Sequence, residues 1–170
     1  RSARRDRRVA HGLRGDRHGA RLGDTWIQSG AGGNDESWLV LDLQGCCDLE
    51  KLVLWNYFEF GGNEQQNASL PDRGVASADI YVATADSGAR IPRNGQGVFN
   101  FKDAGWKLIR PKQTFHKAPV AQGPDHAIEP TDVVDLTGHR AVTHVALARI
   151  KHFARDAFGD YIGLDEIRIV

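Results

Sequence analysis

Several features that would mark particular protein classes are missing from this chain. Its 170 residues include no methionine and two cysteines, Cys46 and Cys47, which are adjacent. Adjacent cysteines strain an intramolecular bridge, and the sequence has neither a CxxC pair nor a cysteine and histidine at zinc-finger spacing. These absences exclude a zinc finger and argue against a disulfide scaffold. We interpret the two cysteines as buried or half-buried thiols at the edge of a strand.

Long apolar runs are missing as well. No stretch of eighteen apolar residues occurs, and the amino terminus lacks the apolar segment of a signal peptide. We therefore expect no membrane span. The absent initiator methionine indicates a fragment or a processed product. A chain of this length buries a core without staples, which favours one compact domain.

Neither sign of charge is in excess, because 22 Lys and Arg balance 22 Asp and Glu. The balance conceals an asymmetry, since residues 1–22 carry eight Arg against two Asp, which gives +6 there and −6 on residues 23–170. Such an arm either binds the phosphate or sulfate groups of nucleic acids or anionic glycans, or is a solvated terminus. We favour the terminus, and the acidic body argues against nucleic acid as a partner.

The pattern that is present is a series of short strands. Apolar and β-branched residues gather in runs bounded by turn-forming residues. The runs are residues 38–43, 49–55, 75–82, 106–109, 132–136, 141–150 and 164–170. A brief turn separates the first two runs, so we expect them to pair. Helix-compatible windows are short, and the pattern predicts an all-β domain, either an antiparallel sandwich or a barrel.

Two connections are long for a compact β domain, at residues 61–72 and 111–131. Ordering loops of this length costs backbone entropy, so such loops are more often functional than idle. The cluster Asn-Tyr-Phe-Glu-Phe at 56–60 leads into the first of them and places three aromatic residues at the mouth of a strand. These loops are where we expect function.

Five motifs in a fixed order carry a family resemblance. They are Asp-Thr-Trp at 24–26, Ser-Trp-Leu-Val-Leu-Asp-Leu at 37–43, Leu-Val-Leu-Trp-Asn-Tyr at 52–57, Arg-Gly-Val at 73–75 followed by Ile-Tyr-Val at 80–82, and Ile-Gly-Leu-Asp-Glu-Ile at 162–167. Over residues 13–170 they resemble the F5/8 type C, or discoidin, superfamily, which includes many family 32-like carbohydrate-binding modules. The resemblance implies an antiparallel jelly-roll β-sandwich of the galactose-binding-domain-like kind.

The resemblance also implies a domain organisation and a function. Residues 1–22 form an Arg-rich amino-terminal arm or first strand, and residues 23–170 form a single F5/8 type C-like β-sandwich domain. The paired cysteines of the blood-factor versions are absent, so the chain looks like the bacterial glycan-binding branch. The implied function is a non-catalytic carbohydrate-binding module of a larger secreted protein, extracellular or periplasmic. Its expected partners are a polysaccharide or glycan and the neighbouring domains of the parent chain.

The implied ligand site combines an aromatic ring, which stacks on a sugar face, with polar side chains that bind its hydroxyls. The expected ligand-binding residues are Asn56, Tyr57, Phe58, Phe60, Arg73, His152, Phe153 and Tyr161. Two alternatives stay open. At least one of the three aromatic residues at 57, 58 and 60 must face inward, and Arg73 either contacts the ligand or holds its loop through backbone carbonyls.

A structural Ca²⁺ ion is the metal that the resemblance implies. Its expected ligands are Asp16, Asp24, Thr25 and Glu166, completed by backbone carbonyls, because Ca²⁺ takes hard oxygen ligands. The alternative is that Asp16 and Asp24 form Asx turns beside glycines. For the function, two alternatives are kept. One is a structural or protein-interaction domain in a multidomain assembly, and the other is a small polysaccharide hydrolase or lyase with convergent carboxylates.

Overall fold

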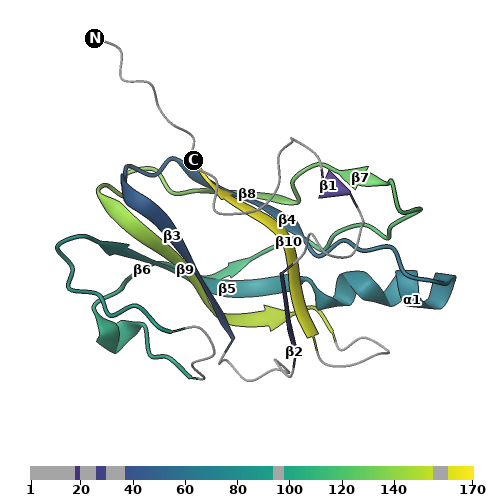
Figure 1. Cartoon of the computed structure of the whole chain (residues 1–170), viewed down its shortest axis with the longest axis horizontal. Coiled ribbons are helices and arrows are strands. Elements are labelled where there is room, and N and C mark those ends of the chain that lie inside the picture. Colours follow the sequence, from purple (N-terminus) through teal and green to yellow (C-terminus); the bar gives the residue numbers. More distant parts are fainter. Residues whose placement is uncertain (1–17, 20–25, 30–36, 94–97, 155–160) are drawn as a thin grey trace, which may run out of the picture.

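The computed structural model describes residues 18–19, 26–29, 37–93, 98–154 and 161–170. Its strands are β1 (His18–Gly19), β2 (Trp26–Ser29), β3 (Trp38–Cys47), β4 (Lys51–Asn56), β5 (Val75–Thr84), β6 (Lys107–Thr114), β7 (Ala127–Ile128), β8 (Asp132–Asp135), β9 (Val142–His152) and β10 (Tyr161–Ile169). Its helical segments are α1 (Glu64–Ser69), η1 (Leu70–Arg73) and η2 (Lys102–Ala104). Short strands therefore dominate, as the sequence predicts, with α1 projecting from one end (Figure 1).

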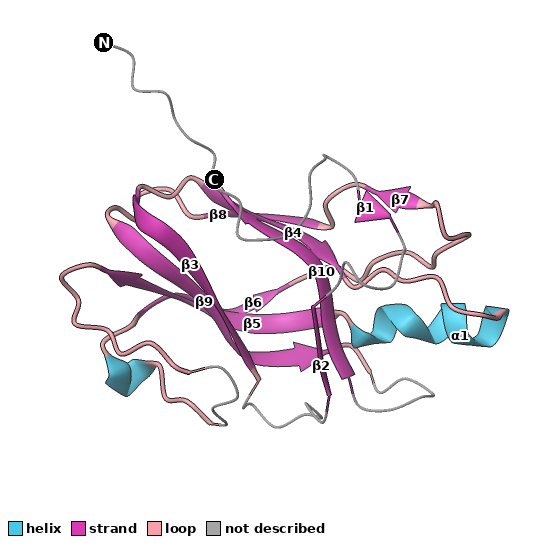
Figure 2. Ribbon diagram, in the orientation of Figure 1, coloured by secondary structure: helices cyan, strands magenta, loops and turns pink. Residues whose placement is uncertain are grey.

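Two four-stranded antiparallel sheets form the body of the molecule. The first, called the β10 sheet, has the order β2-β10-β4-β8, and the second, called the β9 sheet, has the order β3-β9-β5-β6. The two sheets pack face to face, and loops rather than helices make most of the connections (Figure 2). β1 and β7 form a separate two-stranded pair.

The strand pairs are nested along the chain, with each outer pair enclosing the next. β5 pairs with β6, β4 with β8, β3 with β9 and β2 with β10, all antiparallel. Two further pairs, β10 with β4 and β9 with β5, join these nested pairs into the two sheets. Nested antiparallel pairing across two sheets is the jelly-roll arrangement, so the predicted fold class is confirmed.

Each predicted run from residue 38 onward contains a strand, but one pairing prediction is wrong. Residues 38–43 and 49–55 were expected to pair, yet β3 lies in the β9 sheet and β4 in the β10 sheet. The chain crosses between the layers at the turn from Asp48 to Glu50, so this short turn joins two sheets and does not close a hairpin. β3 ends at the two cysteines; Cys47 is half-buried as predicted, but Cys46 is exposed, so the prediction of a buried or half-buried thiol is wrong for Cys46.

The main core fills the space between the two sheets. The β9 sheet contributes Ile80, Val82, Val145 and Leu147, and the facing residues of the β10 sheet are Leu52, Leu54, Ile162 and Leu164. These positions alternate along each strand, which is the period that places every second side chain on one face. The hydrophobic pattern read from the sequence therefore fixes which face of each strand is buried between the layers.

The outer faces of both sheets are also covered. On the β9 sheet, Tyr81, Ala146 and Ala148 pack beneath an aromatic group that includes Phe101 and Trp106. On the β10 sheet, Val53 and Trp55 pack beneath Phe58 and residues of the 115–131 segment, namely Ala118, Ala121 and Ile128. The long connections thus act first as covers for apolar faces that a two-layer sandwich would leave in water.

The two long loops that the sequence singles out meet at one end of the sandwich, called the α1 end. The strand register brings the ends of β4, β6 and β9 together there with the starts of β5, β8 and β10.

In the described part of the chain, no helix is long and apolar enough to cross a membrane. Of the predicted Arg-rich arm at 1–22, residues 1–17 and 20–22 lie outside the described residues, so the interpretation of the arm stays a prediction.

Substitution of Gly163 in β10 tests the packing at the α1 end. A Cβ atom at position 163 would collide with ring carbons of Tyr57, whereas a Cβ at Gly123 would meet no atom within 4 Å. We expect Gly163→Ala to lower the free energy of unfolding by about 1–3 kcal/mol, as overpacking does. Gly123→Ala is the matched control and should stay within about 0.5 kcal/mol of the parent chain. Thermal or urea unfolding measures both, and equal midpoints for the two variants would contradict the packing described.

Candidate functional site

Asn56 is predicted as a ligand contact, but the structure places it in the interior. Its side-chain amide is fully buried and makes four hydrogen bonds. Nδ2 donates to the carbonyls of Val75 and His116, at 2.8 Å each, and Oδ1 accepts from the N–H groups of Val75 at 2.7 Å and Tyr57 at 3.0 Å. These bonds use the full capacity of the amide, so Asn56 organises the α1 end instead of contacting a ligand.

Tyr57 and Phe58 are likewise buried, so their assignment as ligand contacts is wrong, and the alternative that at least one of the three aromatic residues faces inward holds for these two. Both side chains are fully inaccessible to solvent. The Tyr57 ring lies against Gly163, and Phe58 packs in the outer cluster on the β10 sheet, with its ring 5.1 Å from that of His126. The physical reason is the 115–131 segment, which folds back over this face and covers residues that leave a strand end.

Arg73 lies in a compact cluster with both predicted tyrosines. Its Nη1 atom is 3.1 Å from the Tyr57 hydroxyl and 3.6 Å from Oε2 of Glu59. Its guanidinium carbon lies 4.8 Å from the centre of the Tyr161 ring and 5.7 Å from that of Tyr57, which are cation–π distances. The Arg73 side chain is 12% exposed. Arg73 therefore ties the loop that follows β4 to the start of β10 through side chains.

The electrostatics of this cluster keep Tyr57 protonated. Burial raises the pKa of the Tyr57 hydroxyl well above its usual value, and its hydrogen bond to the Glu59 carboxylate raises it further, against the opposing effect of Arg73. The hydroxyl thus donates to Glu59, while the carboxylate of Glu59 and the guanidinium of Arg73 balance one another. A buried, hydrogen-bonded cluster of this kind stabilises the α1 end.

The closing segment holds the other two predicted residues, His152 and Phe153. Both are half-buried. The backbone N–H groups of Phe153 and Ala154 donate to the carbonyl of Asp72, at 3.1 and 3.2 Å, and fasten this segment to η1. The structure therefore brings His152 and Phe153 to the same end as Arg73 and Tyr161. Their role in ligand contact stays a prediction.

Phe60 is the predicted aromatic residue that remains accessible, at 36% exposure. It lines a hollow of about 500 Å³ between the start of α1 and the 115–131 segment. The hollow is lined by Phe60, Gly62, Asn63, Glu64, Asn67, Val120, Ala121 and Gln122. An exposed aromatic ring beside several polar side chains is the combination that the sequence predicts for Tyr57, Phe58 and their neighbours.

The polar residues of the hollow were missed by the sequence analysis, although they lie in the two loops it singled out. Asn63 caps α1 by accepting the N–H of Gln66 through Oδ1, at 2.9 Å, and Asn67 accepts the N–H of Gly61 through Oδ1, at 2.5 Å. Their oxygens are thus engaged within the loop. The signal available in the sequence was the density of amides at positions 63 to 67, which also fits an ordinary turn.

The calcium prediction falls mostly on residues that are not described. Asp16, Asp24 and Thr25 lie outside the described residues, and Glu166 is buried with its two carboxylate oxygens 2.5 and 3.2 Å from nitrogens of Arg168. Within the described ranges, no three His, Cys, Asp or Glu side chains converge as metal ligands. Glu166 by itself does not fit a calcium site, because a guanidinium already occupies both its oxygens, and the ion stays a prediction.

Comparisons with known proteins give a likeness in structure. No family model matches the sequence, and no curated protein matches it either. Among solved structures, the chain is similar to the F5/8 type C domain of a Bacteroides fragilis protein, with 15% identity and a TM-score of 0.46 over 88% of this chain and 74% of that one. It is also similar to a fucose-binding module of Streptococcus pneumoniae, with 18% identity and a TM-score of 0.34 over 87% and 72%. At these levels neither match assigns a ligand to this chain.

The buried Asn56 amide provides the test of this description. Asn56→Ala leaves two backbone carbonyls and two backbone N–H groups without partners in the interior, so we expect the free energy of unfolding to fall by about 3 kcal/mol or more. Asn100→Ala is the control, because the hydrogen bonds of Asn100 to Asp103 are exposed and water replaces them. Urea unfolding followed by tryptophan fluorescence measures both. Similar losses in the free energy of unfolding for the two variants would show that the hydrogen bonds of Asn56 do not stabilise the α1 end.

Proposed function

We propose that this domain is a non-catalytic carbohydrate-binding module that holds a glycan in the Phe60 hollow at the α1 end. One observation carries the proposal, namely an accessible aromatic ring that borders a hollow of about 500 Å³ whose other side chains include Asn63, Asn67 and Gln122. Sugars present apolar C–H faces and rings of hydroxyls, so their recognition needs an aromatic surface and hydrogen-bonding groups together. The resemblance of the sequence motifs to F5/8 type C carbohydrate-binding modules supports the same function.

The amides of the hollow suit the hydroxyls of a sugar. Asn63 and Asn67 each use their side-chain oxygen within the loop, so their N–H₂ groups are the parts that face a ligand's oxygen atoms. Gln122 offers a donor and an acceptor from the opposite wall, beside the apolar surface of Val120 and Ala121. Binding at such a shallow site is weak, on the order of millimolar to micromolar, and is useful through the avidity of an attached protein.

The composition of the hollow favours binding over hydrolysis. Among the described residues that line it, Glu64 is the one carboxylate. Glycoside hydrolysis ordinarily uses two carboxylates on either side of the scissile bond. On the motif resemblance, we further place the domain in a larger extracellular or periplasmic protein, where it binds a polysaccharide for its parent chain and packs beside neighbouring domains.

Phe60→Ala tests the proposed site. Removal of the ring takes away the surface on which a sugar stacks, so we expect the dissociation constant for a bound polysaccharide to rise about tenfold, which corresponds to about 1.4 kcal/mol. Gln122→Ala should weaken binding as well, because its exposed side chain makes no hydrogen bond in the described structure. A glycan array identifies the ligand, and titration calorimetry then measures the three proteins.

Leu108→Ala is the control for Phe60→Ala. Leu108 is an exposed apolar residue of similar accessibility, 42% against 36%, and lies on β6, away from the hollow. Its replacement should leave glycan binding unchanged. The proposal is wrong if no polysaccharide on the array binds the parent protein, or if Phe60→Ala binds as tightly as Leu108→Ala.

A structural Ca²⁺ ion is part of the proposal, resting on the motif resemblance at Asp16, Asp24 and Thr25. Because bound metal adds its binding free energy to folding, removal by a chelator should lower the melting temperature by several degrees, and added Ca²⁺ should restore it. Glu166→Gln does not serve as this test, since it also breaks the ion pair with Arg168. Identical melting curves with and without chelator would remove calcium from the proposal.

A further inference from the structure

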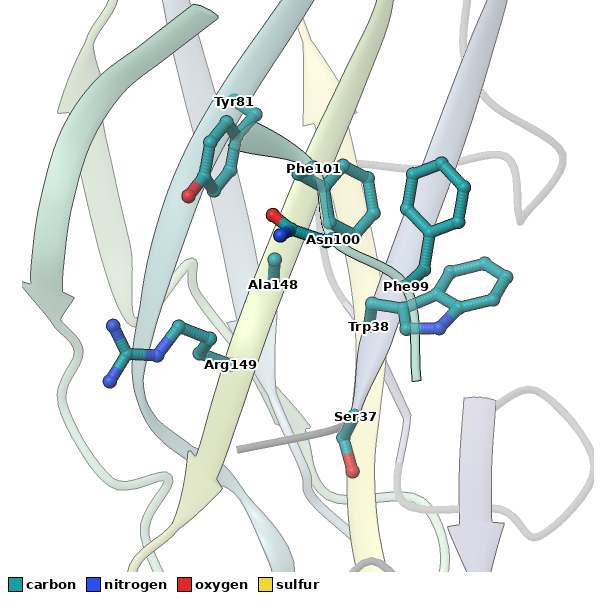
Figure 3. A pocket seen from close by; sticks show the side chains of 8 residues that line it. All are labelled: Ser37, Trp38, Tyr81, Phe99, Asn100, Phe101, Ala148 and Arg149. Carbon is teal, nitrogen blue, oxygen red and sulfur yellow. The ribbon is translucent and has the colours of Figure 1, made fainter. Parts of the chain in front are cut away.

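A second pocket lies on the outer face of the β9 sheet. It has a volume of about 70 Å³, and Figure 3 shows the eight side chains that line it. Those side chains are Ser37, Trp38, Tyr81, Phe99, Asn100, Phe101, Ala148 and Arg149. None of them belongs to the Phe60 hollow. The small side chain of Ala148 leaves the space open, the Tyr81 hydroxyl and the Asn100 amide lie beside it, and the Arg149 side chain borders it with its guanidinium directed away from the aromatic rings (Figure 3).

The aromatic wall of this pocket is rigid. The ring of Phe101 stacks on that of Tyr81, with centres 5.4 Å apart, and meets the rings of Phe99 and Trp38 edge-on at 4.8 and 6.2 Å. Each of these pairs has a geometry that aromatic rings favour. Because Tyr81 is held in this group, its hydroxyl has a fixed position beside the pocket.

Arg149 reaches the pocket through an irregularity in β9. Ser77 and Asp79 of β5 pair with Lys151 and Ala148, so β9 has one more residue than β5 between these two points, which is a β-bulge. Arg149 is that bulged residue and has a φ of 52°, in the left-handed region that non-glycine residues rarely adopt. The bulge places Ala148 and Arg149 on the same outer side, and Ile150 returns to the core.

Asp79 of β5 lies on the same outer face of the sheet and contacts the bulged residue. It is 5% exposed, its Oδ2 lies 3.7 Å from Nη1 of Arg149, and its Oδ1 accepts the N–H of Lys112 at 2.7 Å. The Arg149 side chain is itself half-exposed, so a ligand can reach it. A left-handed arginine fixed by a buried carboxylate is a costly arrangement, and such features mark functional positions more often than neutral ones.

The Tyr81 hydroxyl completes the polar side of the pocket. Within the described ranges it has no hydrogen-bond partner, although the residue is 7% exposed. Burial raises the pKa of this hydroxyl, and the nearby Asp79 carboxylate raises it further, against a smaller opposing effect of Arg149, so the group remains a donor at neutral pH. The oxygen of the Asn100 amide already accepts the N–H of Asp103.

We propose that this pocket binds the oxyanion substituent of an acidic sugar, either the carboxylate of a uronic acid or a sulfate ester. Tyr81 and Arg149 both present donors, which match the acceptor oxygens of such a group. A volume of about 70 Å³ is roughly that of two waters in the liquid, enough for a carboxylate or sulfate head but not for a sugar ring. The sugar ring then lies outside the pocket, against the exposed surface.

The site is independent of the Phe60 hollow and extends the function to acidic glycans. Its test is an NMR titration of the ¹⁵N-labelled full chain with glucuronic acid, with glucose as the control that lacks the carboxylate. We expect glucuronic acid, at millimolar concentration, to shift the amide signals of Tyr81, Ala148 and Arg149, and glucose to leave them in place. A sulfated galactose and inorganic sulfate form two further arms.

Three variants locate the binding. Tyr81→Phe removes the hydroxyl and keeps the ring packing, and should raise the dissociation constant for glucuronic acid about tenfold, as loss of a hydrogen bond to a charged group does. Arg149→Gln should weaken binding by a similar or larger factor, and Ala148→Leu should abolish it by filling the pocket. Arg140→Gln removes an exposed cation elsewhere and should have no effect. Phe60→Ala should leave this binding unchanged even if it abolishes binding of neutral glycans.

The outcomes separate the alternatives. Loss of binding in Tyr81→Phe, with an unchanged melting temperature, supports the site even if Ala148→Leu fails to fold. Equal shifts with glucose and glucuronic acid would overturn the proposal, as would binding that survives both Tyr81→Phe and Arg149→Gln. If inorganic sulfate binds as tightly as the sulfated sugar, the pocket recognises a free anion and the assignment to a glycan is wrong.

Discussion

The arrangement of the α1 end depends on one buried amide. Asn56 binds the backbone of three separate segments, which are the chain leaving β4, the first residue of β5 and the start of the 115–131 segment. The segment after Tyr57 forms one wall of the Phe60 hollow, and the segment after His116 forms the other. Both segments are therefore held at their starts by hydrogen bonds to the Asn56 side chain. Gly74 belongs to this constraint, because a Cβ atom there would meet the Asn56 oxygen at 2.6 Å.

The fold was largely predictable, because alternation of apolar residues is a local property. β5 shows this between Ala78 and Val82, where alternate residues enter the inter-sheet core and Tyr81 enters the outer cluster. Strand partners are not a local property. The short turn between β3 and β4 suggested a hairpin, but it carries the chain from one sheet to the other, and the sequence of the turn does not distinguish the two.

The location of the candidate site was predictable from the sequence, but most of the residues that form it were not. The sequence pointed to the segment after β4 and to the two long loops, which do meet at the α1 end. It did not show that the 115–131 segment folds over Phe58, since that cover depends on Ala118 and Ala121, some sixty residues away. The bulge at Arg149 was equally hidden, because the run 141–150 reads as one regular strand. Contacts between distant segments decided which aromatic residue stayed exposed.

The nested pairing also determines when the chain can fold. β10 lies between β2 and β4, and β9 lies between β3 and β5, so the two strands that join the rest of each sheet come last in the chain. Until they are synthesised, β2 and β3 have no strand beside them, β4 and β5 are paired only with β8 and β6, and the two sheets cannot be completed. Folding must then close long loops before either sheet is complete, and such non-local pairing makes folding slow. A chain interrupted before β9 would present unpaired strand edges, the kind of surface that leads to aggregation.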